Sequence, residues 1–227
     1  MQVLGDKPIS AVAVLIRALT IVAVPVILLA SPLYLYVSSW FVSFQYDRWY
    51  VEPSTRFERQ EREDLSDVLI RFLRHRATEA DMATMRTSGG GLAMRPPEVQ
   101  HIVDVGRVMD GFFVAQRVAL AALAAAIALA LAAKRAQGLA QGLLTGVWTT
   151  LGLMVVVLVA VVINFDAFFT LFHKLLFTGD SWLFYVDDML IQLYPIGFWI
   201  GAVTIMALTI VAEAGITWAL ARFVARW

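Results

Sequence analysis

Apolar positions dominate this chain in four stretches, each of about twenty residues or more. A helix of that length and composition can cross the hydrocarbon core of a bilayer. Polar residues are concentrated in the section between the first two stretches. The pattern predicts an all-α membrane protein, a single membrane domain over 1–227, with four transmembrane helices at about 17–40, 112–133, 143–163 and 196–220.

The first apolar stretch begins as a signal peptide would, with Ala30-Ser31 in the place of a cleavage site. It continues through SPLYLYVSSWFVSF, however, which takes it well beyond the apolar core of ~7–15 residues that signal peptides have. We therefore expect an uncleaved transmembrane helix that Pro25 and Pro32 kink.

Residues 45–110 form the one hydrophilic section, which we call the head region. Asp64 and Ser66 offer helix caps, and Leu65 and Leu69 mark the apolar face of a short helix that ends near His75. The glycine-rich stretch 87–91 predicts a turn that closes a small hairpin. Pro96-Pro97 suits the first turn of another helix, at about 98–109, with Val99 and Ile102 on one side and His101, Asp104 and Arg107 on the other.

The segment 164–195 is too apolar for a plain connector and still carries ionisable groups. Phenylalanines surround His173 in FDAFFTLFHKLLF, and Asp166 can cap this stretch as a helix. A helix that is apolar on most sides and about a dozen residues long is too short to span. We expect it to lie in the membrane interface or to re-enter the bilayer.

Basic residues in the short segments predict the orientation. The N-terminus, the 134–142 turn and the C-terminus carry lysine and arginine, whereas 164–195 carries Lys174 against four aspartates. The positive-inside rule then places both termini in the cytoplasm, in a cell (plasma or inner) membrane. The head region and the segment 164–195 lie on the outer face.

The composition limits which partners and which catalytic groups the protein can have. The net charge is zero, which gives no reason to expect a nucleic acid partner. The chain has no cysteine, so disulfides and a thiol nucleophile are excluded. It has three histidines, so few side chains can act as a base near neutral pH.

Two of the histidines stand out from the third. Asp104 can orient His101 from the next turn of the same helix, although such pairs are often only surface contacts. His173 can equally be an interfacial anchor, and His75 lies among arginines on a solvated face. Two charges fall within predicted spans. Arg117 could hold a lipid or a carboxylate, such as Asp110 or Asp166, or extend its side chain to the membrane interface, and Glu213 could pair with Arg17.

Two groups of residues together resemble the lipoprotein intramolecular transacylase (Lit) family. The first is EVQHIVDV at 98–105, similar to the family's E-x-x-H-M-x-D-V pattern. The second follows the F-x-x-x-F-H-x-x-x-F-x-N-D-x-W … F-P pattern with Phe165-Asp166, Phe169 to His173, Phe177, Asp180, Trp182 and Tyr194-Pro195. Gly179, Phe184-Tyr185 and Ile196 depart from it.

The resemblance implies a reaction and a site. The family moves the sn-2 acyl chain of a diacylglyceryl lipoprotein to the α-amino group of the same lipid-modified cysteine, which gives the lyso form. The partners are then a diacylated lipoprotein and membrane lipids, without a cofactor or metal. The catalytic residues would be His101 and His173, with supporting or substrate-binding roles for Glu98, Asp104, Arg117, Asp166, Asp180 and Trp182.

Two other functions compete with this one. A membrane metallohydrolase could use His101, Asp104 and His173 as zinc ligands, with water in the fourth position. A non-enzymatic lipid-binding scaffold would need the histidines only as loop caps.

Overall fold

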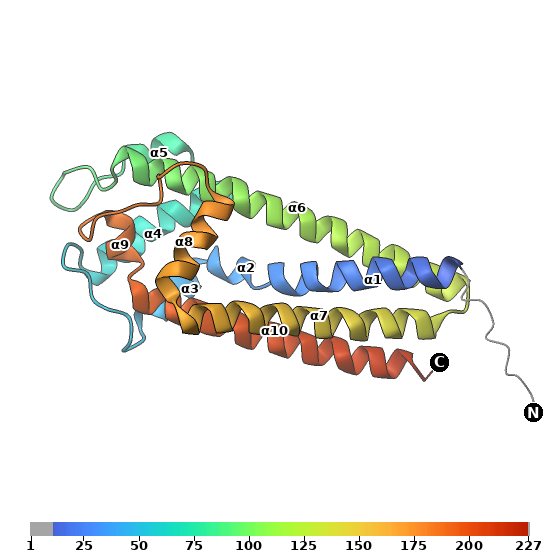
Figure 1. The fold of residues 1–227 in the computed structure, drawn as a ribbon. Helices are drawn as coiled ribbons and strands as arrows, with labels where there is room; N and C mark the ends of the chain where they lie inside the picture. Colours follow the sequence, from blue (N-terminus) through green and yellow to red (C-terminus); the bar gives the residue numbers. More distant parts are fainter. Residues whose placement is uncertain (1–10, 227) are drawn as a thin grey trace, which may run out of the picture. The chain divides into compact units, whose positions relative to one another are not determined.

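Residues 11–226 are described by a computed structural model, and most of them lie in helices (Figure 1). Lys7, one of the N-terminal basic residues on which the predicted orientation rests, lies outside this range. The helices of the described chain are α1 (Ala11–Ala30), α2 (Leu33–Tyr36), α3 (Ser39–Tyr46), α4 (Arg59–Leu73), α5 (Glu79–Ala83), α6 (Pro96–Ala132), α7 (Ala136–Ile163), α8 (Phe165–Leu176), α9 (Met189–Leu193) and α10 (Ile196–Val224).

Four of these helical segments within residues 11–226 are long and apolar enough to cross a membrane, which confirms the predicted fold class. The first covers Ala11–Tyr36 and is interrupted after Ala30. Pro25 lies inside α1 without ending it, whereas Pro32 occupies the N-cap position of α2. A proline suits a helix start because it has no N–H to leave unpaired there. The interruption therefore lies at Pro32.

The two predicted helices at 98–109 and 112–133 are one continuous helix, α6. Gly111 does not end it, since one glycine costs only about 1 kcal/mol inside a helix with strong helix formers on both sides. In the head region, α4 begins at Arg59, five residues before the first predicted cap, so Asp64 and Ser66 lie inside it. The predicted hairpin is confirmed as a single antiparallel bridge between Arg86 and Leu92.

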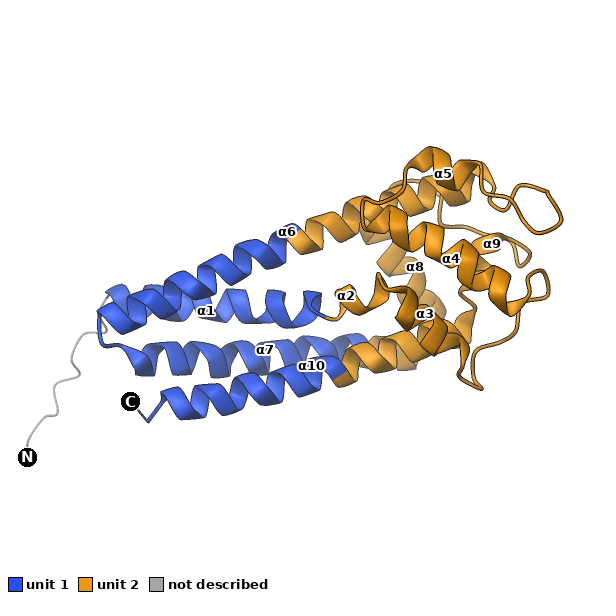
Figure 2. Ribbon diagram, turned by 180° about the vertical axis from the view of Figure 1, so that it is seen from behind, with its two compact units in different colours: residues 1–31, 114–157, 209–227 blue, residues 32–113, 158–208 orange. Residues whose placement is uncertain are grey.

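The chain divides into two compact units (Figure 2). Unit 1 comprises 1–31, 114–157 and 209–227, and unit 2 comprises 32–113 and 158–208. The head region and the segment 164–195 both belong to unit 2. Helices α6, α7 and α10 each contribute to both units.

In unit 1, glycines of α7 bring its backbone close to α1. A Cβ atom added at Gly142 would lie 2.7 Å from Cβ of Thr20, and one added at Gly146 would lie 2.6 Å from Cβ of Val24. Small residues four apart allow this close approach of membrane helices. The spacing Gly138-x-x-x-Gly142-x-x-x-Gly146 is typical of such a contact.

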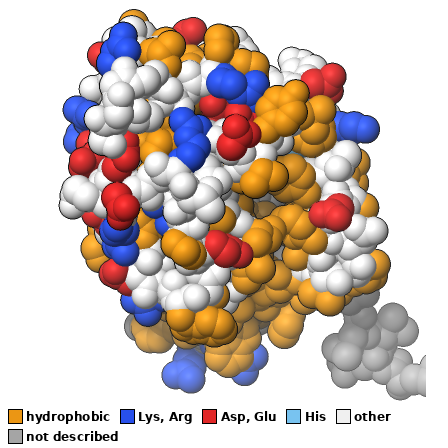
Figure 3. Space-filling model, turned by 90° about the vertical axis from the view of Figure 1, so that its left-hand side faces the viewer, with side chains coloured by type: hydrophobic (Ala, Val, Ile, Leu, Met, Phe, Trp, Pro, Cys, Tyr) orange, Lys and Arg blue, Asp and Glu red, His pale blue; other side chains and the backbone are white. Residues whose placement is uncertain are grey.

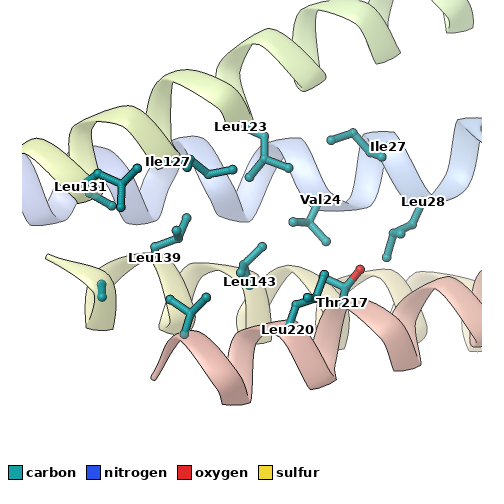
Figure 4. A pocket seen from close by; sticks show the side chains of 13 residues that line it. Val24, Ile27, Leu28, Leu123, Ile127, Leu131, Leu139, Leu143, Thr217 and Leu220 are labelled. Atoms are coloured by element: carbon teal, nitrogen blue, oxygen red, sulfur yellow. The ribbon is translucent and has the colours of Figure 1, made fainter. Parts of the chain in front are cut away.

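Unit 1 also holds an apolar cavity of about 410 Å³ between α1, α6, α7 and α10 (Figure 4). Its lining is aliphatic except for Thr217. The predicted pair of Arg17 and Glu213 is wrong, because the Glu213 carboxylate accepts a hydrogen bond of 2.5 Å from the Ser31 hydroxyl. Ser31 directly follows α1 at its C-terminal end, whereas Arg17 lies in the first half of that helix.

In unit 2, the N-terminal turns of α6 pack with α4, α5 and α9 around one apolar core. Buried members of this core include Leu65, Leu69, Met82, Ile102 and Met189. Over α4, α5 and α9 the outer surface carries basic and acidic side chains intermixed, without a patch of one sign (Figure 3). This core fixes the part of α6 on which His101 lies.

Candidate functional site

His173 is presented by α8, a helix of twelve residues in which no residue is fully buried. The side chain of Asn164 caps it by accepting a hydrogen bond from the Ala167 amide, 3.0 Å away. The predicted cap, Asp166, lies instead in the first turn and is exposed. Asn164 holds the position because α7 ends at Ile163 and α8 follows directly.

The Nδ1 atom of His173 lies 2.8 Å from the carbonyl oxygen of Phe169, one turn earlier in α8. A carbonyl oxygen can only accept a hydrogen bond, so Nδ1 carries the proton. In the neutral ring the lone pair is then on Nε2, where it can take a proton. Burial lowers the pKa of His173 below the usual imidazole value, and the hydrogen bond to Phe169 partly opposes this shift.

His101 lies in the second turn of α6 and is buried, with only 7% of its surface exposed. Its ring stacks against that of His173, with a distance of 6.0 Å between centroids and an angle of 25° between planes. Its Nδ1 atom is buried without a hydrogen-bond partner among the described residues. Segments from 165–188 cover His101, whereas Arg107 on the same face of α6 is exposed, so His101 is not part of a surface pair with Asp104.

Aromatic side chains enclose the two imidazoles. The ring of Phe169 lies 4.0 Å and that of Trp182 5.1 Å from His173, centroid to centroid. Phe177 lies 4.9 Å and Phe184 5.3 Å from His101. The indole N–H of Trp182 donates to the Gly179 carbonyl, so the polar end of this side chain is satisfied. We call this enclosure the aromatic chamber: His101 and His173 walled by Phe169, Phe177, Trp182 and Phe184.

Asp104 does not orient His101. Its carboxylate accepts hydrogen bonds from the Gln100 amide, at 3.0 Å, and from the Arg107 guanidinium, at 2.7 Å. These partners lie on the outer side of α6 and satisfy the same carboxylate oxygen. The zinc ligand set of the competing metallohydrolase is not assembled either, since no three His, Asp or Glu side chains of residues 11–226 are grouped to hold a metal ion.

Glu98 is fully buried one turn before His101. Its two carboxylate oxygens accept hydrogen bonds from the backbone amides of Arg95, at 2.8 Å, and Leu190, at 2.9 Å. Glu98 thus satisfies one free N–H at the start of α6 and one at the start of α9. It fastens the helix that carries His101 to the segment after the chamber.

A second contact joins the same two segments, and the sequence did not predict it. The Arg95 guanidinium pairs with the Asp188 carboxylate through both Nε and Nη2, and the Asp188 side chain is only 4% exposed. Burial alone would raise the pKa of Asp188, but hydrogen bonds from Arg95 and from the Tyr185 amide hold it below its usual value. In the sequence, the pair is indicated only by the opposite charges of two distant residues, and many other pairs of residues in this chain have opposite charges.

The remaining candidates lie apart from the chamber. Asp180 is exposed, on the loop between Phe177 and Trp182. Arg117 is exposed in unit 1, sixteen residues beyond His101 along α6, and Asp110, one of its suggested partners, pairs with His75 at 2.9 Å. The His75 side chain is 73% exposed, which agrees with its interpretation as a solvated face.

The apolar helices of membrane-spanning length define an integral membrane protein. Its candidate site is the pair of imidazoles that aromatic side chains surround. Comparison with known proteins makes this more specific. The sequence model of the lipoprotein intramolecular transacylase Lit matches residues 17–199. The chain belongs to the Lit family, whose members are membrane acyltransferases that act on lipoproteins.

Solved structures agree on the fold. The lipoprotein intramolecular transacylase Lit from Bacillus cereus has a TM-score of 0.78 and 22% identity, over 94% of this chain and 96% of that chain. Variants of the same protein with one histidine replaced by arginine or by alanine both have TM-scores of 0.72 and 21% identity, over 94% of this chain and 92% or 94% of theirs. No curated protein matches in sequence.

Proposed function

We propose that this protein moves the sn-2 acyl chain of a diacylglyceryl lipoprotein to the α-amino group of the same molecule's N-terminal cysteine. The products are an amide at that cysteine and a free hydroxyl on the glyceryl group, the lyso form. The observation that carries the proposal is the stacked pair of His101 and His173 inside the aromatic chamber. Membership of the Lit family supports the same reaction class.

His173 is the general base in this proposal. An α-amino group has a pKa near ~7.7–8 and is partly protonated at neutral pH. The free-amine fraction reacts, and Nε2 of His173 can accept the proton that the nitrogen loses on acylation, because Nδ1–H is held by Phe169. The amine lone pair attacks the ester carbonyl carbon, and the new C–N bond leaves a negative charge on the carbonyl oxygen.

His101 stabilises that oxyanion. Its Nδ1 atom has no hydrogen-bond partner within the described chain, so the imidazole has unused hydrogen-bonding capacity inside the chamber. A buried donor is worth far more to a developing charge than one in water. When the tetrahedral intermediate collapses, the ester C–O bond breaks and the glyceryl oxygen receives the proton from the His173 imidazolium.

The chain brings no covalent nucleophile to this step, and none is needed. Amine and ester belong to one substrate molecule, so selecting a compact conformer of that molecule supplies much of the rate. The substrate's acyl chains lie in the membrane. Exposed apolar side chains on α8, such as Leu171, Phe172 and Leu175, suit a helix that lies in the membrane interface. We place this surface and the histidines on the outer face of the cell membrane.

Mass spectrometry of the N-terminal peptide of a co-expressed lipoprotein tests the proposal. Cells with the wild-type chain should convert the diacylated peptide to the N-acyl lyso form. His101→Ala and His173→Ala should each reduce conversion by at least about a hundredfold, the usual range for a lost acid–base or oxyanion group. His75→Ala is the matched control and should convert normally. Wild-type conversion by His173→Ala would contradict the mechanism.

A further inference from the structure

The segment 183–187 covers His101 with Phe184, and its other side chains are exposed. Phe184 lies against the imidazole, edge to face, at an interplanar angle of 71°. Its neighbours Leu183, Tyr185 and Val186 are 56%, 69% and 80% exposed. Phe184 is thus the inward contact of a segment that otherwise faces away from the chamber.

Apart from Phe184, which packs against the apolar core of unit 2, the segment buries little apolar surface, so its polar contacts help to hold it in place. Asp188 provides three of them: two from the Arg95 guanidinium and one, at 2.7 Å, from the Tyr185 amide. The Arg95 guanidinium also lies over the Tyr185 ring, 4.9 Å from its centroid. A two-pronged pair between arginine and a buried carboxylate is among the stronger fixed contacts in proteins.

We propose that the Arg95–Asp188 pair is a positioning device that keeps Phe184 closed over His101, and that Phe184 thereby decides whether the acyl group goes to the amine or to water. This inference rests on the proposed acyl transfer. Arg95 and Asp188 touch neither substrate nor reacting atoms in this role. They act through Phe184.

The chemistry behind the choice is a competition at one carbonyl carbon. In transfer, the amine nitrogen attacks, and the ester C–O bond breaks to give amide and alcohol. In hydrolysis, a water oxygen attacks, His173 takes the water proton and returns it to the glyceryl oxygen, and a free fatty acid leaves with the ester C–O bond broken. Both routes use the same base. Only exclusion of water from the chamber separates them.

The ratio of hydrolysed to transferred product therefore reports whether Phe184 covers His101. N-terminal peptides that keep a free amine but have lost one acyl chain report hydrolysis, and N-acyl lyso peptides report transfer. Phe184→Ala and Asp188→Asn should each raise the hydrolysed fraction by about tenfold relative to wild type. Phe184→Leu keeps an apolar cover and should restore most of the wild-type partition.

Val186→Ala and Arg86→Gln are the controls. Val186 is exposed two residues from Phe184. Among residues 11–226, the hydrogen bond of the Arg86 side chain goes to the Gly90 carbonyl in the head region. Neither should change the partition. A wild type that gives no N-acyl product contradicts the proposed function itself. A transferring wild type whose partition is unchanged in Phe184→Ala contradicts the positioning role alone.

A measurement without substrate covers the case of an inactive variant. In the purified protein, water that enters beside the imidazoles should move the titration of His173, followed by NMR, upward toward the usual value of about 6.5. Asp188→Asn should show this shift while its thermal unfolding remains cooperative. A cooperative Asp188→Asn protein with the wild-type His173 titration would overturn the proposal.

Discussion

The ring centroids of His101 and His173 lie 6.0 Å apart, with the two ring planes only 25° from parallel. One imidazole comes from the start of a membrane-spanning helix and the other from a short helix that is not long enough to span. The rest of the chamber wall is aromatic, so each ring is the titratable group that faces the other. This arrangement makes pH the first test of the site.

Protonation of His173 should lower the rate of acyl transfer only under acidic conditions. Its pKa is lowered by burial, so the imidazole stays neutral, and competent as a base, at pH 7 and somewhat below 6.5. Protonation of the substrate amine already lowers the rate about tenfold for each unit below its pKa of about 8. The slope of log rate against pH should therefore steepen from about 1 to about 2 at a pH below about 6.5. A break at or above that value in single-turnover measurements would show a solvated base.

Glu98→Gln should weaken the fold around the site. The carboxylate accepts two backbone N–H bonds in a fully buried place, and a glutamine side chain turns one acceptor into a donor that faces an N–H. We expect a loss of about 1–3 kcal/mol in the free energy of unfolding, measured by denaturant titration in micelles. Glu79→Gln, on an exposed position of α5, is the control and should change little. Equal stabilities would mean that the bridge to Leu190 contributes nothing.

Gly146→Ala should destabilise unit 1. The added methyl group would lie 2.6 Å from Cβ of Val24, so α1 and α7 must separate. Overpacking of this kind costs about 1–3 kcal/mol, and Val24→Ala in the same chain should recover part of it. Gly152→Ala lies on the same helix with nothing within 4 Å of its Cβ, and it should be neutral or slightly stabilising. Similar unfolding curves for Gly146→Ala and Gly152→Ala would contradict the close packing of α7 on α1.

The proposed orientation can be tested with single cysteines, since the natural chain has none. Glu79→Cys, in the head region, should react with a membrane-impermeant maleimide added to whole cells. Gln137→Cys, within the basic segment 134–142, should react only after the membrane is permeabilised. Both positions are exposed in the structure, so access through the protein does not limit either reaction. The reverse labelling pattern would place the histidines on the cytoplasmic side.

The sequence by itself determined the four membrane helices and the helices that carry His101 and His173. Hydropathy and the helical period are local properties that neighbouring residues carry, and a membrane accepts apolar segments of that length only as helices. The sequence was less accurate at ends and interruptions. Asn164 rather than Asp166 caps α8, and Gly111 leaves α6 continuous, because caps and single glycines change helix stability by only about 1 kcal/mol.

Only the tertiary structure decided which residues serve the histidines. Asp104 has the right spacing to orient His101, yet Arg107 and Gln100 take its carboxylate. Arg95 and Asp188 are distant in the chain and become partners because α9 returns to the start of α6, where Glu98 also bonds Leu190. Spacing along one helix limits which of its side chains can meet. Which ones do meet depends on where distant segments pack against that helix and on which side chains compete for the same partner.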